Sequence, residues 1–542
     1  MNILGTRSLA LLALSSATLA ASSETSPAPW QSALVSYDPA TGALDYAADA
    51  EGNRIPDFSH AGYRGADVPL PGLDAIPVLA TLTPEPGDNT ERLQTALDAL
   101  AEHPVDPATG LRGALLLSPG VFEVRATLYL RHSGVVLLGS GSGDDPARDT
   151  ILRRTGTETT AVLVAGNPQQ YDKFSHAVPD TRVDIVTPRV QVGSRAFSVA
   201  DASPFSVGDT VVVEHPVTEA WIQALDGGGT AADPDWKVGD SEAEMTIRYL
   251  RRVTAIRPAS GPGEHPTLEI DAPVYNHLDR SLSQSTVYRY DTSAFVTEVG
   301  VARLRVDIET EGPEAENHAR DGIIFRGALD CWARDVTVLH FVAAGIKFGP
   351  DFARGTVLDS RALDPHCRVK PPFRYNFCVN QGQLILFENC HATHARHAFI
   401  SNGTTMDSGI VFLDCVNDHS TATSEGHRRW SHGLLFDGIV TREHASNGPA
   451  ILGLYNRGDW GNGHGWAAAH SVAWRCDTAG GRLTVQKPPT AQNYAIGCFG
   501  NVTGRGSFPQ PAGYIEGSQR PGLQPASLYR AQLAARRGAS ER

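Results

Sequence analysis

The sequence predicts an all-β protein, a right-handed parallel β-helix (a solenoid) with an N-terminal capping helix and an inserted antiparallel β subdomain. Three observations predict this fold: a short β-prone unit that recurs through the second half of the chain, an amphipathic segment ahead of the first strands, and a stretch at 190–285 where the recurrence is interrupted. The 542 residues, 41% of them apolar, suffice for one large elongated domain or two ordinary ones.

Residues 1–20 are expected to be a secretory signal peptide. Arg7 supplies the positive charge, 9–14 form a short apolar core, and 18–20 form a small-residue cleavage site. This run, like every later one, is too short to span a bilayer. We therefore expect a mature chain that begins near Ala21, has no membrane span and is secreted or periplasmic. An uncleaved anchor is the alternative that the pattern leaves open.

Region 21–189 is predicted to hold the N-terminal cap and the first coils of the solenoid. Asp88, Asn89 and Thr90 are typical of a helix N-terminus, and apolar residues then recur at helical spacing through 93–100. Terminal repeats of a solenoid need such a cap. Short apolar runs that follow the helix predict strands at 114–117, 122–124, 128–130 and 135–138.

Residues 190–285 are predicted to form the inserted subdomain. β-prone runs at 205–213 and 252–256 flank a Gly- and Asp-rich loop at 226–240. Such runs favour antiparallel strands, and we expect this subdomain to wall one side of a groove.

Region 286–502 is predicted to be the main β-helix and to carry the functional face. The segments 384–390 and 409–415 align with each other, and 357–360 and 472–476 follow the same frame. Equivalent positions of a solenoid stack coil on coil, so Cys390 and Cys415 are expected inside, each preceded by Asn or Asp. Residues 503–542 are expected to form a C-terminal docking segment, with a short helix near 527–533, and a tail.

The seven cysteines form no C-x-x-C pair, which argues against a zinc or thioredoxin-like site. In an oxidising compartment Cys367 and Cys378 could form a disulfide bridge. The odd number leaves at least one thiol free.

Charge excludes one class of partner and favours another. A formal net charge of −14 argues against nucleic acid, because phosphate binding needs a dense basic surface. Ten of the nineteen histidines nevertheless lie between His366 and His470, together with several arginines. Such a patch indicates an anionic or polar ligand.

Several segments resemble a known family. "GDNTERLQTALDAL", "GALLLSPGVFEV" and "LYLRHSGVVLLGSG" resemble the pectate-lyase-like superfamily of right-handed parallel β-helix proteins, and "CWARDVTVLHF", "HARHAF", "SEGHRRW" and "GNGHGW" resemble a bacterial secreted branch of it with no assigned substrate. The superfamily includes polysaccharide lyases, glycoside hydrolases, uronate epimerases and phage-type binding proteins. The resemblance implies an extracellular polysaccharide or oligosaccharide as partner, and a monomer or a homo-oligomer.

A polysaccharide lyase must neutralise a uronate carboxylate, remove the proton at C5 and protonate the leaving oxygen. We expect His427 or His397 to act as the base. Arginines are expected to clamp the carboxylate, and a tyrosine is a plausible proton donor. These candidates are Arg374, Arg396, Arg428 and Tyr375.

Further residues on the same face are expected to bind substrate. Trp430 and Trp466 are candidate platforms on which a sugar ring could stack. His464 lies in the "GNGHGW" motif, and His340 precedes an equivalent coil.

Two other functions stay open at this point. A glycoside hydrolase needs two carboxyl groups about 5–9 Å apart, for which Glu425 and Asp321 are the candidates. A non-catalytic glycan-binding solenoid is the third hypothesis. No cofactor fingerprint or zinc signature occurs, and no metal ligand is assigned. The acidic loop at 141–149 leaves Ca²⁺ possible, although it lacks the ligand spacing of an EF-hand.

Overall fold

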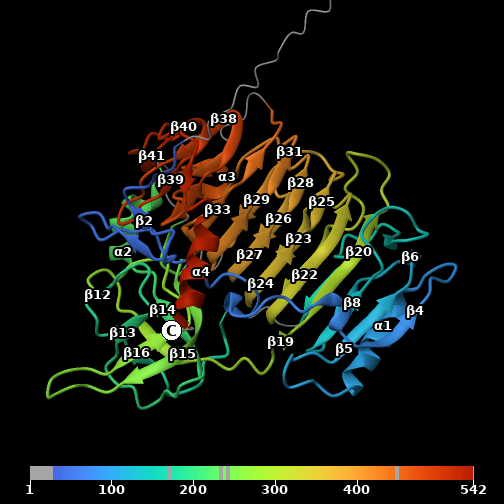
Figure 1. Ribbon diagram of the computed structural model, residues 1–542, viewed down its shortest axis with the longest axis horizontal. Helices are drawn as coiled ribbons and strands as arrows, with labels where there is room; N and C mark the ends of the chain where they lie inside the picture. Colours follow the sequence, from blue (N-terminus) through green and yellow to red (C-terminus); the bar gives the residue numbers. More distant parts are fainter. Residues whose placement is uncertain (1–27, 168–173, 231–235, 240–244, 446–450, 541–542) are drawn as a thin grey trace, which may run out of the picture.

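The computed structural model describes residues 28–167, 174–230, 236–239, 245–445 and 451–540 (Figure 1). The predicted signal peptide at 1–20 lies outside the described residues, as does part of the Gly- and Asp-rich loop at 226–240. Within the described ranges, none of the helices has the length and apolar character needed to cross a membrane.

The body of the protein is a right-handed parallel β-helix, as predicted, in which each strand pairs in parallel with its equivalent one coil away. The face that carries the candidate site follows the order β7 (Leu128–Leu130), β10 (Leu163–Gly166), β21 (Asp321–Arg326), β23 (Ala344–Phe348), β26 (Tyr375–Val379), β29 (His397–Ser401), β32 (Ser424–Gly426), β35 (Leu452–Leu454) and β38 (Asp477–Val485).

A second face runs along the whole solenoid. Its order is β4 (Val78–Leu82), β5 (Gly113–Leu117), β8 (Val135–Leu138), β20 (Gly300–Ile308), β22 (Ala328–Leu339), β24 (Phe352–Leu358), β27 (Gly382–Glu388), β30 (Ser408–Leu413), β33 (Ser431–Asp437), β37 (Val472–Trp474), β39 (Tyr494–Ile496) and β41 (Tyr514–Glu516). The short β19 (Val296–Thr297) pairs with the start of β22.

The third face shares strands with the other two, because β20 and β22 are long enough to turn a corner. Its order is β6 (Gly120–Val124), β9 (Thr150–Arg154), the end of β20, the end of β22, β25 (Arg361–Leu363), β28 (His391–Thr393), β31 (Val416–Asp418), β34 (Val440–Thr441), β38 and β40 (Phe499–Thr503).

The corners between faces are rows of residues in the left-handed backbone region, which Gly, Asn and Asp adopt most easily. One row accounts for the Asn or Asp that precedes Ser360, Cys390 and Cys415 in the sequence repeat, because each coil turns a corner at this position. The row contains Arg303, Asp335, Asp359, Asn389, Asp414, Gly438, Arg475 and Gly497, all with φ between 48° and 69°. A second row contains Glu298, Asp330, Arg354, Leu384, Gly409 and Gly433, and a third contains His340, Asp364, His394 and His419. Corner side chains therefore stack in columns on the outside.

The interior is a continuous apolar column. Phe325 stacks on Phe348 at 5.1 Å between ring centroids, and Phe387 stacks on Phe412 at the same distance. Cys390 and Cys415 are buried in this core, as predicted. All seven cysteines are free thiols, so the bridge considered between Cys367 and Cys378 is wrong. Each of these two thiols donates to a backbone carbonyl instead, Cys367 to Val342 and Cys378 to Val379.

The helix predicted ahead of the first coils is α1 (Thr90–Ala99), which lies beside β4 and β5 at one end of the solenoid (Figure 1). Leu93 and Leu97 enter the interior column. The carboxylate of Asp88 accepts a hydrogen bond from the backbone N–H of Thr90. The loop at 141–149 closes on itself, with the Asp145 carboxylate accepting from Ala147 N–H.

An antiparallel sheet packs against the outside of the second face. Tyr249 and Tyr275 of this subdomain are fully buried and share a core with Leu384 and other outward-facing residues of β27, β30 and β33. A Cβ at Gly433 would lie 2.4 Å from the ring of Tyr275, so the sheets approach closely there. The sheet order is β11 (Val183–Asp184), β18 (Thr286–Arg289), β14 (Thr210–His215), β15 (Ile247–Arg257), β16 (Thr267–Ile270) and β13 (Ala196–Ser198), and β12 (Arg189–Val190) pairs with β17 (Leu278–Asp279) nearby.

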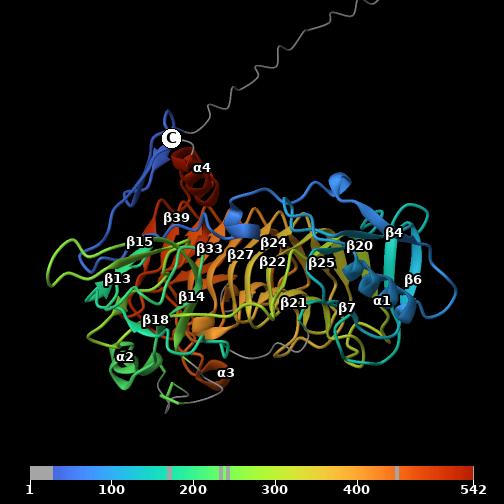
Figure 2. The same cartoon turned by 90° about the horizontal axis from the view of Figure 1, so that it is seen from below.

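The two ends of the described chain meet. β1 (Trp30–Gln31) pairs in parallel with β42 (Leu523–Gln524), next to the hairpin β2 (Val35–Tyr37) and β3 (Leu44–Tyr46). The final helix α4 (Leu528–Ser540) rises on the same side as this N-terminal segment, opposite the short helices α2 (Glu219–Ala224) and α3 (Trp460–Gly463) (Figure 2).

Acidification is expected to destabilise the fold. Burial lowers the pKa of His215 and His432 to about 4 and that of His277 to about 3. The unfolded chain binds these protons below about pH 6.5, whereas the folded chain excludes them down to about pH 4, so the free energy of unfolding rises with pH across that window. The buried carboxyls of Asp407 and Asp437, with pKa raised to about 6, and of Glu425, with pKa raised to about 7, act in the opposite sense. The buried histidines outnumber them, because burial also lowers the pKa of His397, His427, His464 and His470.

Urea unfolding at pH 5 and pH 7 checks this expectation. His432→Gln should lose less stability on acidification than the wild type, whereas His419→Gln, at an exposed position, should behave like the wild type. Equal unfolding free energies at the two pH values would contradict the prediction.

Candidate functional site

A cavity of about 470 Å³ opens on the first face, beside the coils that contain β26, β29, β32 and β35. Its walls carry the predicted cationic and imidazole groups, together with Pro371 and Pro372 from the loop that precedes β26. Among the described residues that line this cavity, none is Asp or Glu. The titratable groups in its lining are Tyr375, Arg396, His397, His427, Arg428, Tyr455, Arg457 and His464.

Parallel register brings these groups together from distant parts of the sequence. Tyr375 of β26 and His397 of β29 are direct partners across neighbouring strands. Glu425 of β32 pairs with Gly453 of β35, and the same register places His427 beside Tyr455 just past the ends of these strands. Neighbouring strands lie about 4.8 Å apart, so side chains from consecutive coils can touch.

Glu425 lies beneath the cavity floor and is fully buried. Its Oε1 lies 2.6 Å from Nδ1 of His427 and 3.2 Å from Nη1 of Arg457. Its Oε2 accepts a hydrogen bond of 2.7 Å from the Tyr455 hydroxyl. Burial raises the pKa of Glu425 to about 7, although Arg457 and the Tyr455 hydrogen bond act against this rise.

The three histidines of the site are neutral at pH 7. Burial, reinforced by the charge of Arg457, lowers the pKa of His427 well below its usual range and that of His464 to about 3. Burial followed by the charges of Arg396 and Arg457 does the same to His397.

In His397 and His427, the two ring nitrogens have different hydrogen-bond partners and differ in whether a ligand in the cavity can reach them. Nδ1 of His397 lies 2.6 Å from the carbonyl oxygen of Thr423, so this nitrogen carries the proton and donates. Nε2 of His397 therefore holds the lone pair, but this atom is buried and has no hydrogen-bond partner among the described residues. In His427, Nδ1 lies 2.6 Å from Oε1 of Glu425 and 2.6 Å from Nη1 of Arg457. In the tautomer whose Nδ1 donates its proton to Glu425, the lone pair lies on Nε2.

Arg457 is the central cation. Its Nη1 donates to the backbone oxygen of His427 at 2.7 Å and lies 2.8 Å from Nδ1 of His464. The guanidinium also stacks over Trp460, 5.6 Å from the ring centroid. His397, Glu425 and His427 have the spacing of a metal site, with ligand atoms within 4.8 Å of one another. Because Arg457 already contacts two of the three ligands, it takes the place of a metal ion there.

Arg396 and Arg428 are half-buried in the cavity wall. Arg396 donates to the Tyr375 hydroxyl at 3.1 Å, and Arg428 donates from Nε to the backbone oxygen of Asn402 at 3.4 Å. Since the Tyr375 oxygen accepts from Arg396, its own proton is free to be donated. Burial raises the pKa of Tyr375, so this hydroxyl stays protonated at neutral pH.

The structure brings seven of the predicted residues together. Six line the cavity and the seventh, Glu425, supports it from below. The lining six are His427, His397, Arg428, Arg396, Tyr375 and His464.

The two predicted tryptophan platforms are wrong. Trp430 and Trp466 are fully buried, so neither offers a ring face to a sugar. Arg429 and Trp430 both take left-handed backbone conformations, which turn the chain inward. Trp430 meets the edge of Trp221 in the antiparallel subdomain and donates to Asn276.

Three further predicted residues lie away from the cavity. The Arg374 guanidinium donates to the backbone oxygens of Cys367 and His394, and His340 contacts Asp307. Asp321 shares the strand row of Tyr375 and His397, but β21 is four strands from β32. At about 4.8 Å per strand this is about 19 Å from Glu425, too far for a hydrolase pair.

Sequence reasoning gave no role to Tyr455, Arg457 or Trp460, although Arg457 is one of the arginines of the cationic segment. All three lie one coil beyond Glu425 and His427, and Arg457 follows His427 by thirty residues. The coil length varies along the chain, so this correspondence becomes visible only once β35 is paired with β32.

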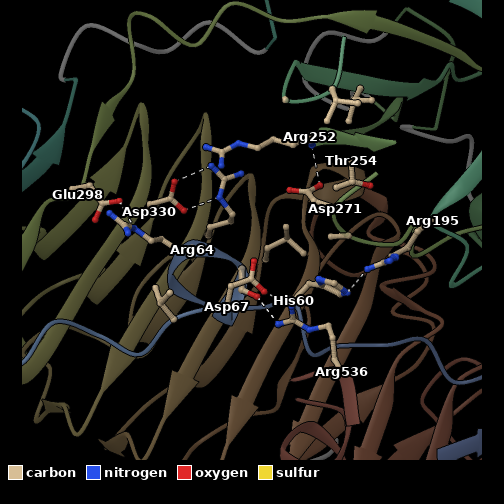
Figure 3. A pocket seen from close by; sticks show the side chains of 18 residues that line it. His60, Arg64, Asp67, Arg195, Arg252, Thr254, Asp271, Glu298, Asp330 and Arg536 are labelled. Carbon is tan, nitrogen blue, oxygen red and sulfur yellow. Dashed lines mark hydrogen bonds and ion pairs between the residues drawn. The ribbon is translucent and has the colours of Figure 1, made fainter. Parts of the chain in front are cut away.

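A larger cavity of about 760 Å³ lies on the second face, between the N-terminal segment, the antiparallel subdomain and α4 (Figure 3). Glu298 and Asp330 occupy neighbouring positions of one corner row. Arg354 binds Asp330 through two hydrogen bonds of 2.7 and 2.9 Å, and Arg64 binds Glu298 at 2.8 Å. These charges are thus largely paired with one another.

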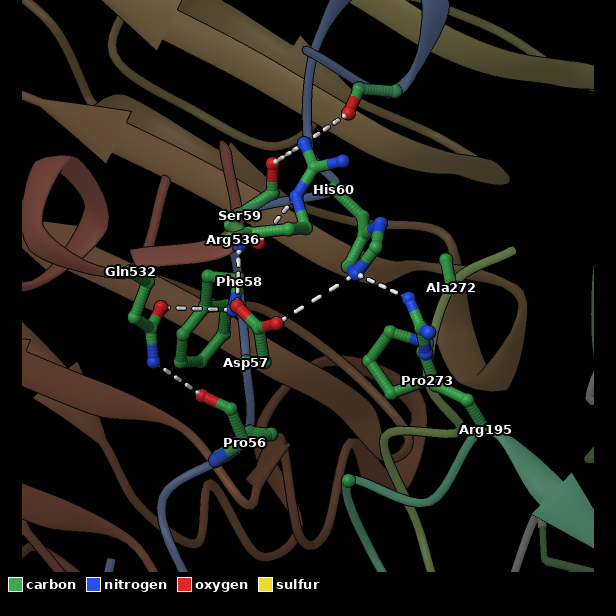
Figure 4. A network of polar contacts seen from close by, with 12 residues as sticks. Pro56, Asp57, Phe58, Ser59, His60, Arg195, Ala272, Pro273, Gln532 and Arg536 are labelled. Carbon is green, nitrogen blue, oxygen red and sulfur yellow. Dashed lines mark hydrogen bonds and ion pairs between the residues drawn. The ribbon is translucent and has the colours of Figure 1, made fainter. Parts of the chain in front are cut away.

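A polar network beside this cavity fastens the two chain ends to each other (Figure 4). Arg536 of α4 donates to the backbone oxygen and to the hydroxyl of Ser59, and Gln532 donates to the backbone oxygen of Pro56. His60 lies between Asp57 and Arg195, at 3.6 and 3.5 Å. Many polar groups beside the larger cavity therefore have hydrogen-bond or ion-pair partners within the protein and need no ligand. The smaller cavity differs, because its wall also carries the half-buried Arg396 and Arg428.

Arg457→Met is expected to destabilise the protein in a pH-dependent way. Removing one partner of a buried ion pair costs about 3–5 kcal/mol. Glu425, with its pKa raised to about 7, is ionised at pH 8 and protonated at pH 5.5, so the loss should be largest at pH 8 and clearly smaller at pH 5.5.

Urea unfolding of the variant at both pH values measures this difference. Arg442→Met, which removes an exposed arginine paired with Asp418, is the matched control and should show no such dependence. A loss that is the same at pH 5.5 and pH 8 would show that Arg457 does not stabilise an ionised Glu425.

Comparison with known proteins finds no matching family model and no matching curated protein. Solved structures do match. The tailspike protein gp49 from Pseudomonas phage LKA1 is 14% identical, with 76% of this chain and 64% of that chain covered and a TM-score of 0.42. Alginate lyase from Paenibacillus sp. str. FPU-7 is 9% identical, with 82% and 99% covered and a TM-score of 0.36. The Azotobacter vinelandii mannuronan C-5 epimerase AlgE4 A-module is 12% identical, with 82% and 97% covered and a TM-score of 0.39. The chain spans less than two thirds of the phage tailspike.

Proposed function

We propose that the protein is a secreted or periplasmic carbohydrate-active enzyme, a polysaccharide lyase that cleaves a uronate-containing polysaccharide by β-elimination in the 470 Å³ cavity. One observation carries the proposal: the buried Glu425 holds His427 at 2.6 Å beneath a cavity walled by Arg396 and Arg428. The signal-like pattern at 1–20 supports export.

The geometry fits the three tasks of the elimination. Arg396 and Arg428 bind the uronate carboxylate and stabilise the charge that develops on it when C5 loses its proton. His427 acts in the tautomer whose Nδ1–H donates to Glu425, so that Nε2 takes the C5 proton and Glu425 stabilises the imidazolium that forms. The C4–O bond then breaks, the C4–C5 double bond forms, and the Tyr375 hydroxyl gives its proton to the leaving oxygen.

His427 fits the role of base better than His397 does. Both are neutral at pH 7, but the lone-pair nitrogen of His397 is buried, whereas neither ring nitrogen of His427 is an orphaned buried atom. We assign the sugar-stacking role expected of Trp430 and Trp466 to Trp460, which is half-buried in the cavity lining, on the ring face opposite Arg457.

A glycoside hydrolase acting in the larger cavity is the second candidate. Its support is the pair of carboxyl groups at Glu298 and Asp330 on neighbouring strands, the first with a pKa raised by burial. Such a pair can act as acid and base around a glycosidic bond. The ion pairs to Arg64 and Arg354 weigh against this role, because they hold both carboxylates in place.

His427→Gln is expected to lower kcat/KM about 10²–10⁴-fold, the usual contribution of a general base. The assay is the ultraviolet absorbance of unsaturated products released from a panel of uronate polymers. His419→Gln, on an exposed corner of a neighbouring coil, is the matched control and should retain full activity. The acid limb of the kcat/KM profile should lie below pH 6.5, because burial lowers the pKa of His427.

The other functions give different results in the same assays. Release of reducing ends without ultraviolet absorbance, abolished by Glu298→Gln and unaffected by His427→Gln, would replace the lyase by the hydrolase. Binding of a polymer with no product from any substrate would identify a non-catalytic glycan-binding protein. An unchanged kcat/KM in His427→Gln would remove this histidine from the mechanism.

A further inference from the structure

A cluster of imidazole and carboxylate groups lies on the third corner row, away from the cavity. His340, Asp364 and His394 occupy equivalent corner positions of three consecutive coils, each with a left-handed backbone. His366, two residues beyond Asp364, points to the same place. Ligand atoms of His340, Asp364 and His366 all lie within 4.8 Å of one another.

Asp364 is the centre of this cluster. Its Oδ2 lies 3.5 Å from Nε2 of His366 and 4.0 Å from Nε2 of His340. Its Oδ1 lies 3.9 Å from Nδ1 of His394. Among the described residues, the ion-pair partners of this carboxylate are these histidines, in contrast to Glu425, which is contacted by Arg457.

Hydrogen bonds at Nδ1 of His340 and at Nδ1 of His366 fix the tautomers of these two rings. Nδ1 of His340 lies 3.1 Å from the carboxylate of Asp307, which can only accept, so this nitrogen carries the proton. Nδ1 of His366 lies 3.2 Å from the Thr310 hydroxyl oxygen, whose own proton is donated to the backbone oxygen of Gly312. In both rings the lone pair therefore lies on Nε2, the atom nearest to Asp364.

We propose that His340, Asp364 and His366, with His394 as a fourth ligand, form a binding site for a divalent transition-metal ion of the Zn²⁺ type. Imidazole and carboxylate ligands suit Zn²⁺, whereas Ca²⁺ takes oxygen ligands. Zn–ligand bonds of about 2.0–2.1 Å in a tetrahedron place ligand atoms about 3.3 Å apart. Oδ2 of Asp364 lies 3.5 Å from His366 and 4.0 Å from His340, and His394 lies 3.9 Å from the other oxygen, Oδ1, so the side chains have to turn toward one point to reach this value.

The hydrogen bonds behind the ligands are those that a metal site needs. Metal-bound histidines generally donate their second N–H to a carboxylate or another oxygen, which orients the ring. Asp307 does this for His340, and Thr310 does it for His366. The sequence contains no zinc motif because only Asp364 and His366 are close in the chain, whereas His340 and His394 come from the neighbouring coils and are brought to them by the stacking of corners.

The site would also anchor one wall of the cavity. His366 lies in the loop between β25 and β26, and the same loop carries Pro371 and Pro372, which line the cavity. A metal ion that binds Asp364 and His366 ties the start of this loop to His340 of the preceding coil. The metal is thus a structural clamp, and it takes no part in the proposed elimination.

Calorimetric titration of the chelator-treated full-length protein with Zn²⁺ tests the site. We expect one tight equivalent, tetrahedral Co²⁺ absorption when Co²⁺ replaces Zn²⁺, and a higher Tm with excess metal. The double variant His340→Ala/His366→Ala should bind Zn²⁺ at least about 100-fold more weakly, and Asp307→Asn, which only removes the support behind His340, about 10–100-fold more weakly.

His391→Ala is the matched control, because His391 lies one coil away and contacts Asp418 at 2.9 Å. It should bind Zn²⁺ as the wild type does. His394→Ala, at a more exposed position, gives a second test of the ligand set, and urea unfolding shows whether each variant is folded. Absence of Zn²⁺ binding, or wild-type affinity in the double variant, would overturn the proposal.

Discussion

Parallel pairing between equivalent strands of successive coils is the constraint on which the rest of the structure depends. It makes every position of one coil the neighbour of the same position in the next, at about 4.8 Å. Inside, this produces the stacked Phe and Cys residues. Outside, it produces columns of corner residues and the juxtaposition of Tyr375 with His397. The candidate site and the histidine cluster are both products of this one register.

The site differs from the rest of the surface in how its charges are balanced. In the larger cavity, arginines and carboxylates pair with one another and hold the N-terminal segment and α4 in place. In the smaller cavity, one buried cation, Arg457, faces one buried carboxyl and two neutral imidazoles. Burial of all these groups keeps the imidazoles unprotonated, which is the state that a proton-abstracting group needs at neutral pH.

The fold was predictable because its signals are local and repeated. The frame shared by 384–390 and 409–415 reports the corner geometry directly, since Asn389 and Asp414 adopt the left-handed conformation that Asn and Asp tolerate. The cationic face was predictable for the same reason. Trp430 was misjudged because its exposure depends on the antiparallel subdomain that covers it, and the role of Arg457 was missed because coil lengths vary. Both facts are tertiary, and no local pattern carries them.

The pairing of β1 with β42 changes what kind of repeat protein this is. A solenoid whose coils touch only their neighbours can fray from either end, one repeat at a time. Here the first described strand is hydrogen-bonded to one of the last, and Arg536 and Gln532 of α4 are tied to residues 56–59. The segment that precedes the first coil is thus fastened to the segment that follows the last coil. The contacts that hold the end of the solenoid nearest β42 therefore include residues almost the whole sequence away, so we expect this end to resist fraying more than a solenoid end held by its neighbouring coil alone.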